Sequence, residues 1–350
     1  MTLQFAEHPK TIVWQLTFAC QLRCTHCYTE SGRRASQKLS RDELMRVADV
    51  ILTVKPDFVL VAGGEPLLVP ELFEILATLK TSIGRVWVYT NGLGITERMA
   101  HDFAGLGVQV NVSLDGATSG VHDAIRGRIG AFDETMEGLR TLDRVATSRR
   151  QAGRTKLRFG IDVVVVRSNF AQIEQFFTTI APTLPQLAMV QIGAVIPSGL
   201  AARKEFARHE LLTAEQLAKL ADPVFERHLR AVGPPGLDVV TVVNNVFLQL
   251  HSRQARLPPS ARQIDTLEIE PSGGVRAIET YEGVVGNILH EKPAELWKRC
   301  EQRANDPMYV AELADISTSE EWAAAVRKLD DHFATPEDLH RIRRRPEYTP

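Results

Sequence analysis

The chain has 350 residues, of which 44% are hydrophobic and 24% are charged. Its 41 basic and 43 acidic side chains give a net charge of −2, so composition offers no electrostatic case for binding nucleic acid or an anionic membrane surface. The amino terminus lacks a signal-peptide pattern, and no apolar run reaches membrane-spanning length. We therefore expect a cytoplasmic, enzyme-sized protein. The short basic run at 341–345 is expected to be solvated.

Short β-branched segments alternate with longer amphipathic segments between residues 11 and 196, which predicts βα units and a parallel sheet. The first helix is expected to begin after Ser40, because Glu43 three residues later completes a capping box. The predicted strands are 12–17, 58–61, 86–89, 108–112, 158–166 and 190–195, and further helices are predicted at 71–80, 96–105, 132–146 and 170–180. Six such units favour an α/β fold with a partial (β/α)6 TIM-like barrel, whose strand-end loops share one rim.

Three of the four cysteines, Cys20, Cys24 and Cys27, lie in one loop directly after the first predicted strand. Clustered thiolates at this spacing predict a metal site, and three ligands leave one coordination position open for chemistry. A structural zinc site, with His26 or Cys300 as the fourth ligand, stays open as an alternative. Disulfides are not expected, because ligand-like clustering without a signal peptide fits a reducing compartment.

The C-x3-C-x2-C spacing of this loop resembles the cluster loop of radical S-adenosylmethionine (SAM) enzymes. The resemblance implies that the three cysteines hold one 4Fe–4S cluster, whose fourth iron chelates the amine and carboxylate of SAM. It covers about residues 10–200 with specific motifs, and about residues 260–300 more weakly.

Glycine-rich and polar motifs follow the second and third predicted strands. In Gly63-Gly64-Glu65-Pro66 the glycines let the backbone approach a ligand closely, and a tight turn is the alternative. By the resemblance, this motif contacts the methionine amine of SAM. Asn91 lies in the turn signal after the third strand, and the resemblance places it facing SAM.

Polar residues also follow the fourth predicted strand. By the resemblance, Ser113 binds the ribose hydroxyls of SAM and Arg126 binds its methionine carboxylate, which suits the bidentate geometry of a guanidinium. Between them, we interpret Asp115 as a cap of the following turn and His122 as a helix-start residue packed on the surface.

The remainder of the chain divides into two predicted parts after the radical SAM core at 1–200. Residues 201–260 are expected to form a helical connector, and 261–350 a small α+β extension of hairpin and helices. The strand-turn-strand pattern at 267–278 and the turn at 286–288 are similar to SPASM or twitch domains, which hold extra iron–sulfur clusters in many relatives. No cysteine lies between Cys27 and Cys300, so we expect that fold without a cluster.

The missing auxiliary cluster bears on mechanism, because a substrate radical that ends oxidised must pass on an electron. We therefore expect a redox-neutral conversion, with epimerisation as the first choice. A thiol donates hydrogen atoms well, so Cys300 is a candidate for quenching a carbon radical, with an inert packed thiol as the alternative. Tyr281 and Glu279 are further candidates for a donor or base.

The resemblance implies an enzyme that reductively cleaves SAM to a 5′-deoxyadenosyl radical, which takes a hydrogen atom from the substrate. We expect a small-molecule substrate, such as a carbohydrate or another natural product, and an electron donor such as flavodoxin or ferredoxin. About ten residues before the first strand are too few for the leader-binding module of many peptide-modifying relatives. Two alternatives stay open: a peptide-modifying enzyme whose recognition element is supplied separately, and a non-catalytic iron–sulfur protein.

Overall fold

The computed structural model describes residues 8–35, 39–242, 264–277 and 281–349. Within these ranges, one ten-stranded sheet has the order β10-β9-β8-β1-β2-β3-β4-β5-β6-β7. All pairs from β8 to β7 in this order are parallel, whereas β9 pairs antiparallel with both β8 and β10. The strands are β1 Thr11–Gln15, β2 Phe58–Ala62, β3 Arg85–Thr90, β4 Gln109–Ser113, β5 Phe159–Val165, β6 Met189–Ala194, β7 Asp238–Val242, β8 Thr266–Ile269, β9 Gly274–Arg276 and β10 Val284–Asn287.

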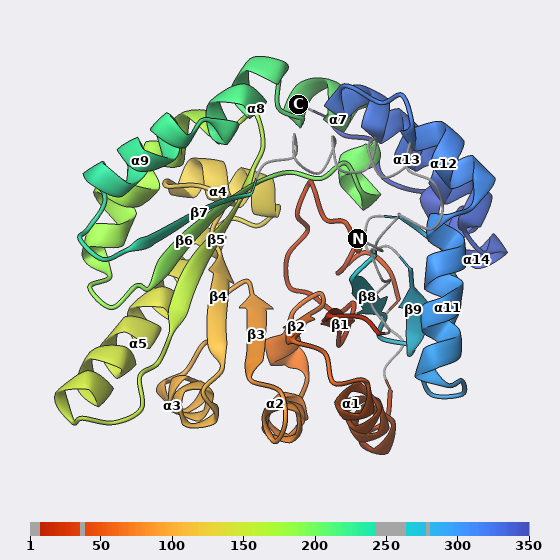
Figure 1. Ribbon diagram of the computed structural model, residues 1–350. Helices are drawn as coiled ribbons and strands as arrows, with labels where there is room; N and C mark the ends of the chain where they lie inside the picture. Colours follow the sequence, from red (N-terminus) through yellow and green to blue (C-terminus); the bar gives the residue numbers. More distant parts are fainter. Residues whose placement is uncertain (1–7, 36–38, 243–263, 278–280, 350) are drawn as a thin grey trace, which may run out of the picture.

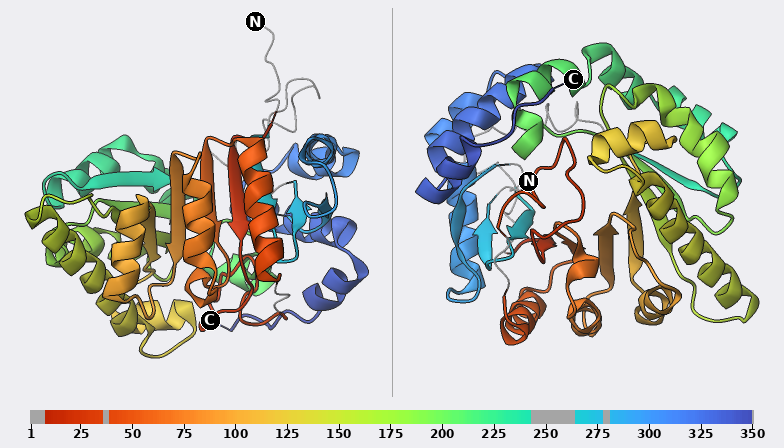
Figure 2. Two further views of the ribbon diagram at one scale, coloured as in Figure 1. Left: turned by 90° about the horizontal axis from the view of Figure 1, so that it is seen from below. Right: turned by 180° about the vertical axis from the view of Figure 1, so that it is seen from behind.

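Helices cover the outer side of this arched sheet. They are α1 Arg41–Val54, α2 Leu72–Lys80, α3 Glu97–Leu106, α4 Ser119–Arg126, α5 Ala131–Gln151, α6 Ile173–Gln175, α7 Lys204–Glu210, α8 Ala214–Ala221, α9 Pro223–Val232, α11 Pro293–Ala304, α12 Pro307–Leu313, α13 Ser319–Phe333 and α14 Pro336–Ile342. Figure 1 shows α1, α2, α3 and α5 along the outside of the arch, and Figure 2 shows the same outline from behind. In the described ranges, no helix combines the length and apolarity needed to cross a bilayer.

Side-chain alternation along the strands separates an outer core from an inner cavity. Val59 and Val61 of β2 pack outward into the main hydrophobic core, whereas Leu60 and Ala62 line a cavity inside the arch. The open parallel sheet confirms the predicted partial barrel, and each of the six predicted strands overlaps an observed one. The capping box of Ser40 at the start of α1 is also present.

The predicted connector contains a strand as well as helices. After α7, α8 and α9, β7 pairs in parallel with β6 and continues the barrel beyond the six predicted strands. Its sequence, Asp-Val-Val-Thr-Val, is β-branched and typical of a strand, but the proline-rich turn before it favours a connector. The end of the connector, 243–260, lies outside the described residues.

The single helix predicted at 170–180 is instead a run of short helical segments. They comprise the 3-10 turn Phe170–Gln172, α6, the π-helical Phe176–Ile180 and the 3-10 turn Ala181–Thr183. Pro182 in the last turn has no backbone N–H to donate, so regular α-helical bonding does not continue there.

The predicted strand-turn-strand of the extension is observed as β8 and β9, with Glu268 opposite Arg276. Ile278, at its predicted end, lies outside the described residues. Because β8 also pairs in parallel with β1, the hairpin continues the sheet of the barrel. The division into three parts therefore stays a prediction.

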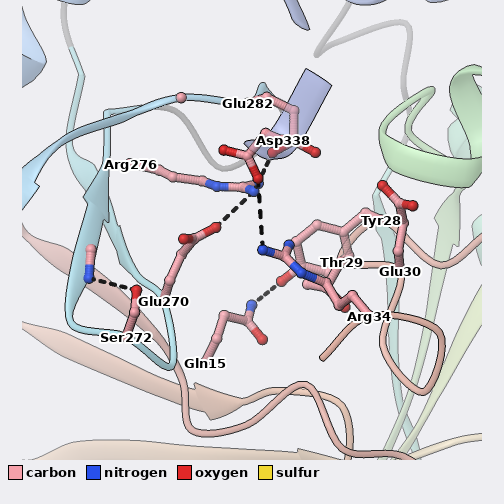
Figure 3. Close-up of polar contacts among 12 residues, drawn as sticks. Gln15, Tyr28, Thr29, Glu30, Arg34, Glu270, Ser272, Arg276, Glu282 and Asp338 are labelled. Atoms are coloured by element: carbon pink, nitrogen blue, oxygen red, sulfur yellow. Dashed lines mark hydrogen bonds and ion pairs between the residues drawn. The ribbon is translucent and has the colours of Figure 1, made fainter. Parts of the chain in front are cut away.

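A buried ion-pair network begins at the end of β9. Arg276 lies 2.7 Å from Glu270 and 2.6 Å from Glu282, and the side chains of Arg276 and Glu282 are each 4% exposed. Figure 3 shows the guanidinium between the two carboxylates. At the position where SPASM and twitch domains usually carry a cysteine, this chain thus has a charged side chain with two partners.

The same network includes the basic run at 341–345, so our expectation of a solvated tail is wrong for two of its arginines. Arg341 and Arg345 both pair with Glu30 of the cysteine loop and with Glu282, the latter at 2.7 and 3.1 Å. The side chain of Arg345 is only 7% exposed. Sequence alone shows the charge run but not the carboxylates that the fold brings to it.

We predict that Glu282→Ala lowers the free energy of unfolding by about 3 kcal/mol or more, because it removes a carboxylate shared by three buried guanidinium groups. Glu312→Ala is a matched control, since Glu312 pairs at 2.8 Å with Lys328, which is 61% exposed, and should cost at most about 1 kcal/mol. Urea unfolding measures both. Equal losses for the two variants would contradict a stabilising network.

Candidate functional site

The inner face of the sheet borders a cavity of about 410 Å³. The cysteine loop after β1 and the inward positions of β2 to β6 contribute to its wall. The predicted site residues on this wall are Cys20, Cys24, Cys27, Gly63, Gly64, Asn91, Ser113 and Arg126. Residues far apart in sequence therefore meet in one place, as expected where the loops of parallel strands converge.

Each of the three thiols has a hydrogen-bonding group directed at its sulfur. The backbone N–H of Leu22 donates to Cys20 Sγ at 3.4 Å, and the Thr29 hydroxyl lies 3.4 Å from Cys27 Sγ. Cys24 Sγ accepts from Arg126 Nη1 at 3.8 Å. Burial raises the pKa of Cys20. Burial also raises the pKa of Cys24 to about 12, although the charge of Arg126 acts in the opposite direction.

A buried carboxylate, Asp115, joins the cysteine loop to the end of β4. Its Oδ2 lies 2.7 Å from Arg126 Nε and 2.9 Å from His26 Nε2, and its Oδ1 accepts from the Val164 N–H at 2.9 Å. Although burial opposes ionisation, Arg126 and His26 hold the pKa of Asp115 below its usual range. Asp115 therefore fixes the position of a guanidinium that faces the cavity.

The sequence-based roles of Asp115 and His122 need correction. Both are fully buried, whereas we expected a turn cap and a surface residue. The backbone N–H of Asp115 donates to His122 Nδ1 at 3.2 Å, and burial, followed by the charge of Arg126, lowers the pKa of His122 to about 4. His122 and Arg126 are four residues apart on α4, so one face of this helix carries both to the strand end.

The two glycines after β2 are required by the cysteine loop itself. Gly63 has a φ of +148°, and the N–H of Gly64 donates to the Thr17 carbonyl at 2.5 Å. A Cβ on Gly64 would overlap the carbonyl of Ala19. The loop after β2 thus lies directly against the backbone of the cysteine loop, while contact of these glycines with SAM stays a prediction.

Glu65 does not line the cavity. It is fully buried, and its carboxylate accepts from the Thr90 hydroxyl at 2.6 Å and from the Asn91 N–H at 2.7 Å, which ties the β2 loop to the end of β3. Burial raises the pKa of Glu65 to about 7. Asn91 does reach the cavity, where its Nδ2 lies 3.9 Å from Cys20 Sγ.

Cys300 lies away from the cavity wall. Its side chain is fully buried in the main core on α11, and burial raises its pKa to about 12. The Tyr281 hydroxyl accepts from Trp322 Nε1 at 3.0 Å in a second core cluster. Glu279 lies outside the described residues.

The zinc alternative finds no ligand set in the part of the chain that the structure describes. No three His, Cys, Asp or Glu side chains there, the three loop cysteines included, form a group that could hold a single metal ion. A 4Fe–4S cluster needs no such group, because each of its thiolates binds a different iron. His26 is paired with Asp115, and Cys300 is packed in the core.

Sequence reasoning missed three polar residues on the cavity wall, namely Tyr89, Asp162 and Gln191. Gln191 Nε2 donates to Asp162 Oδ1 at 2.8 Å. Burial, and then repulsion from Asp115, raises the pKa of Asp162 to about 7. An available signal was an aspartate in the middle of the apolar strand Phe159–Val165, since such a residue must face a partner or a cavity.

Residues 14–149 match the family described as the Radical SAM superfamily. This part of the chain is a radical SAM domain. The mycofactocin maturase MftC of Mycolicibacterium smegmatis is 32% identical over 242 residues, which cover 66% of this chain and 58% of that relative. The AdoMet-dependent heme synthase of Methanosarcina barkeri is 34% identical over 172 residues, which cover 48% of this chain and 46% of that relative. The chain thus spans about half the length of the curated relatives it matches.

Solved radical SAM structures share the fold. SuiB of Streptococcus suis bound to S-adenosylmethionine superposes with a TM-score of 0.64 at 15% identity, covering 89% of this chain and 69% of that chain. Native anSMEcpe with bound AdoMet superposes with a TM-score of 0.60 at 16% identity, covering 95% of this chain and 99% of that chain.

Radical SAM proteins use a 4Fe–4S cluster and SAM, and the residues of this cavity fit both groups. Donors directed at the sulfurs of Cys20 and Cys24, and a hydroxyl beside that of Cys27, suit thiolate ligands, because hydrogen bonds to sulfur stabilise an iron–sulfur cluster. The guanidinium of Arg126, held by Asp115 along one edge, suits a carboxylate.

We predict that Gly64→Ala displaces the cysteine loop, because the new Cβ overlaps the Ala19 carbonyl. Overpacking of this kind costs about 1–3 kcal/mol, and we expect a lower melting temperature and less iron bound after anaerobic reconstitution. Gly84→Ala is the control, since nothing lies within 4 Å of a Cβ there. Unchanged stability and iron content in Gly64→Ala would show that the loop tolerates the methyl group.

We predict that Asp115→Asn lowers the free energy of unfolding at pH 7 by about 3–5 kcal/mol, because it leaves the Arg126 charge buried without a counter-charge. The pKa of Asp115 is depressed, so its contribution is present above the unfolded pKa of about 4 and is lost as pH falls below it. Denaturant unfolding at pH 7, 5 and 3 should show the difference from wild type shrinking at pH 3.

The control is Asp102→Asn. Asp102 lies 3.7 Å from Arg98, whose side chain is 79% exposed, so the free energy of unfolding should change by less than about 1 kcal/mol. A loss in Asp115→Asn that is the same at all three pH values would rule out the charge as its cause.

Proposed function

We propose that this chain is a radical SAM enzyme that cleaves SAM reductively and modifies a peptide. The observation that carries the proposal is the placement of three free thiols on one cavity wall, each with a hydrogen-bonding group at its sulfur. Cys20, Cys24 and Cys27 hold the cluster, and reducing equivalents come from a donor such as flavodoxin or ferredoxin. When bound, the cluster and SAM supply the radical that takes a hydrogen atom from a substrate C–H bond.

The chain's own residues position SAM and exclude water from the cavity. Asp115 occupies Nε of Arg126 and Cys24 Sγ accepts from Nη1, so Nη2 is available to the methionine carboxylate of SAM. Ser113, at the end of β4, lies on the same wall and is assigned to the ribose hydroxyls. The backbone at Gly63 and the side chain of Asn91 are assigned to the methionine amine end.

A peptide is favoured as the substrate over the carbohydrate or other small molecule expected from sequence. A relative at 32% identity is named a maturase, and SuiB, which shares the fold, has been crystallised bound to precursor peptide SuiA. A tetrapyrrole is the second candidate, because a relative at 34% identity is named a heme synthase. In the described residues Cys300 is the one thiol outside the cysteine loop, so a second cluster is not part of this proposal.

We expect each of Cys20→Ala, Cys24→Ala and Cys27→Ala to lose the iron–sulfur absorption and to reduce 5′-deoxyadenosine release to background, because a ligand is lost. Cys300→Ala is the matched control and should keep both, since that thiol is packed in the core. Absorption spectra and chromatography after anaerobic reconstitution with SAM and dithionite measure the two quantities. A brown, active Cys24→Ala protein would contradict the assignment of the ligands.

Substrate class is tested with a precursor peptide encoded near the gene, a panel of sugars and iron-coproporphyrin III. We expect the peptide to accelerate 5′-deoxyadenosine formation and to change in mass or stereochemistry. Acceleration by a sugar or by the tetrapyrrole, and not by the peptide, would overturn the peptide proposal while leaving SAM cleavage intact.

A further inference from the structure

A carboxylate faces the cavity one strand away from the residue assigned to the SAM ribose. Asp162 of β5 pairs in register with Ser113 of β4 and with Gln191 of β6, so the three stand at one level of the barrel. Its neighbour Ile161 belongs to the main core on the outer side. By strand alternation, Asp162 points inward, and it lines the cavity.

This carboxylate has no cation of its own. In the described ranges its one hydrogen bond comes from the neutral amide of Gln191 at 2.8 Å, and none of the ion pairs there includes Asp162. The nearby guanidinium of Arg126 is already paired with Asp115 at 2.7 Å. A carboxylate removed from water without a counter-charge is costly, and the charge of Asp115 adds repulsion, so the pKa of Asp162 rises to about 7.

The surroundings of Asp162 define what kind of group could pair with it. Val164 and Ala194 line the cavity beside it, and Tyr89 and Gln191 supply polar atoms from β3 and β6. A carboxylate at the end of a partly apolar passage suits a cation carried on methylene groups, because the stem packs on apolar side chains while the head reaches the charge. Lysine and arginine side chains have this form.

We propose that Asp162 binds a cationic side chain of the peptide substrate and is therefore a specificity-determining residue. The inference rests on the peptide substrate proposed above. Gln191 orients the carboxylate by its hydrogen bond to Oδ1, which leaves the other carboxylate oxygen for the substrate cation. A lysine or arginine of the substrate would thus be held at the level of Ser113, beside the ribose of SAM.

Binding without turnover tests this inference. The reconstituted protein, saturated with SAM and kept without reductant, is titrated with N-acetylated, amidated glycine pentapeptides that carry lysine, arginine or norleucine at the centre. We expect wild type to bind a lysine or arginine probe at least tenfold more tightly than the norleucine probe. Asp162→Asn should remove this preference, Asp162→Glu should retain it, and SAM affinity should stay unchanged in both.

The matched control is Asp143→Asn on α5, which removes a carboxylate that accepts from the Gln186 N–H at 2.7 Å outside the cavity, and it should keep the preference. Wild type without a preference for the cationic probes, or an unchanged preference in Asp162→Asn, would overturn the inference. A loss of SAM affinity in Asp162→Asn would assign the carboxylate to SAM and would overturn it as well. Wild type that binds neither iron nor SAM would refute the proposed function itself.

Discussion

The arrangement of the cavity depends on one buried carboxylate. Asp115 contacts His26 of the cysteine loop and Arg126 of α4 through its side chain, and its backbone carbonyl accepts from Asn169 Nδ2 at 2.7 Å after β5. Three loops that follow different strands are thus joined at one residue. A carboxylate can remain charged in such a place only because a guanidinium neutralises it, so the two groups maintain each other's burial.

Buried charge recurs on the other side of the cysteine loop, with a different arrangement. Arg276 stands at the end of β9 between two carboxylates, and the network continues through Glu282 to Arg345 and Glu30. In this region, where the sequence has no cysteine between Cys27 and Cys300, opposite charges pair. Such pairs are directional and need all partners in place, so they help to order the junction between β9 and the cysteine loop.

Much of the barrel could be predicted from sequence, because each strand is a local β-branched run and each rim motif follows one directly. Residues of the cavity wall could also be predicted where they belong to a recognisable sequence motif, as Cys20 and Gly64 do. The burial of His122 could not be predicted, since it depends on α4 folding back over the strand end. The pairing of Arg345 with Glu30 could not be predicted either, because the two residues are 315 positions apart in the sequence. The inward position of Asp162 could be predicted, because a carboxylate within an apolar strand must face a partner or a cavity.

The pairing of β1 with β8 has a consequence for how the protein is made. β1 is synthesised well before one of its two neighbours in the sheet, which begins at Thr266. Contacts between such distant segments form slowly and cannot form during early synthesis. The strand that leads into the cysteine loop therefore completes its pairing in the sheet only after Thr266–Ile269 has been synthesised.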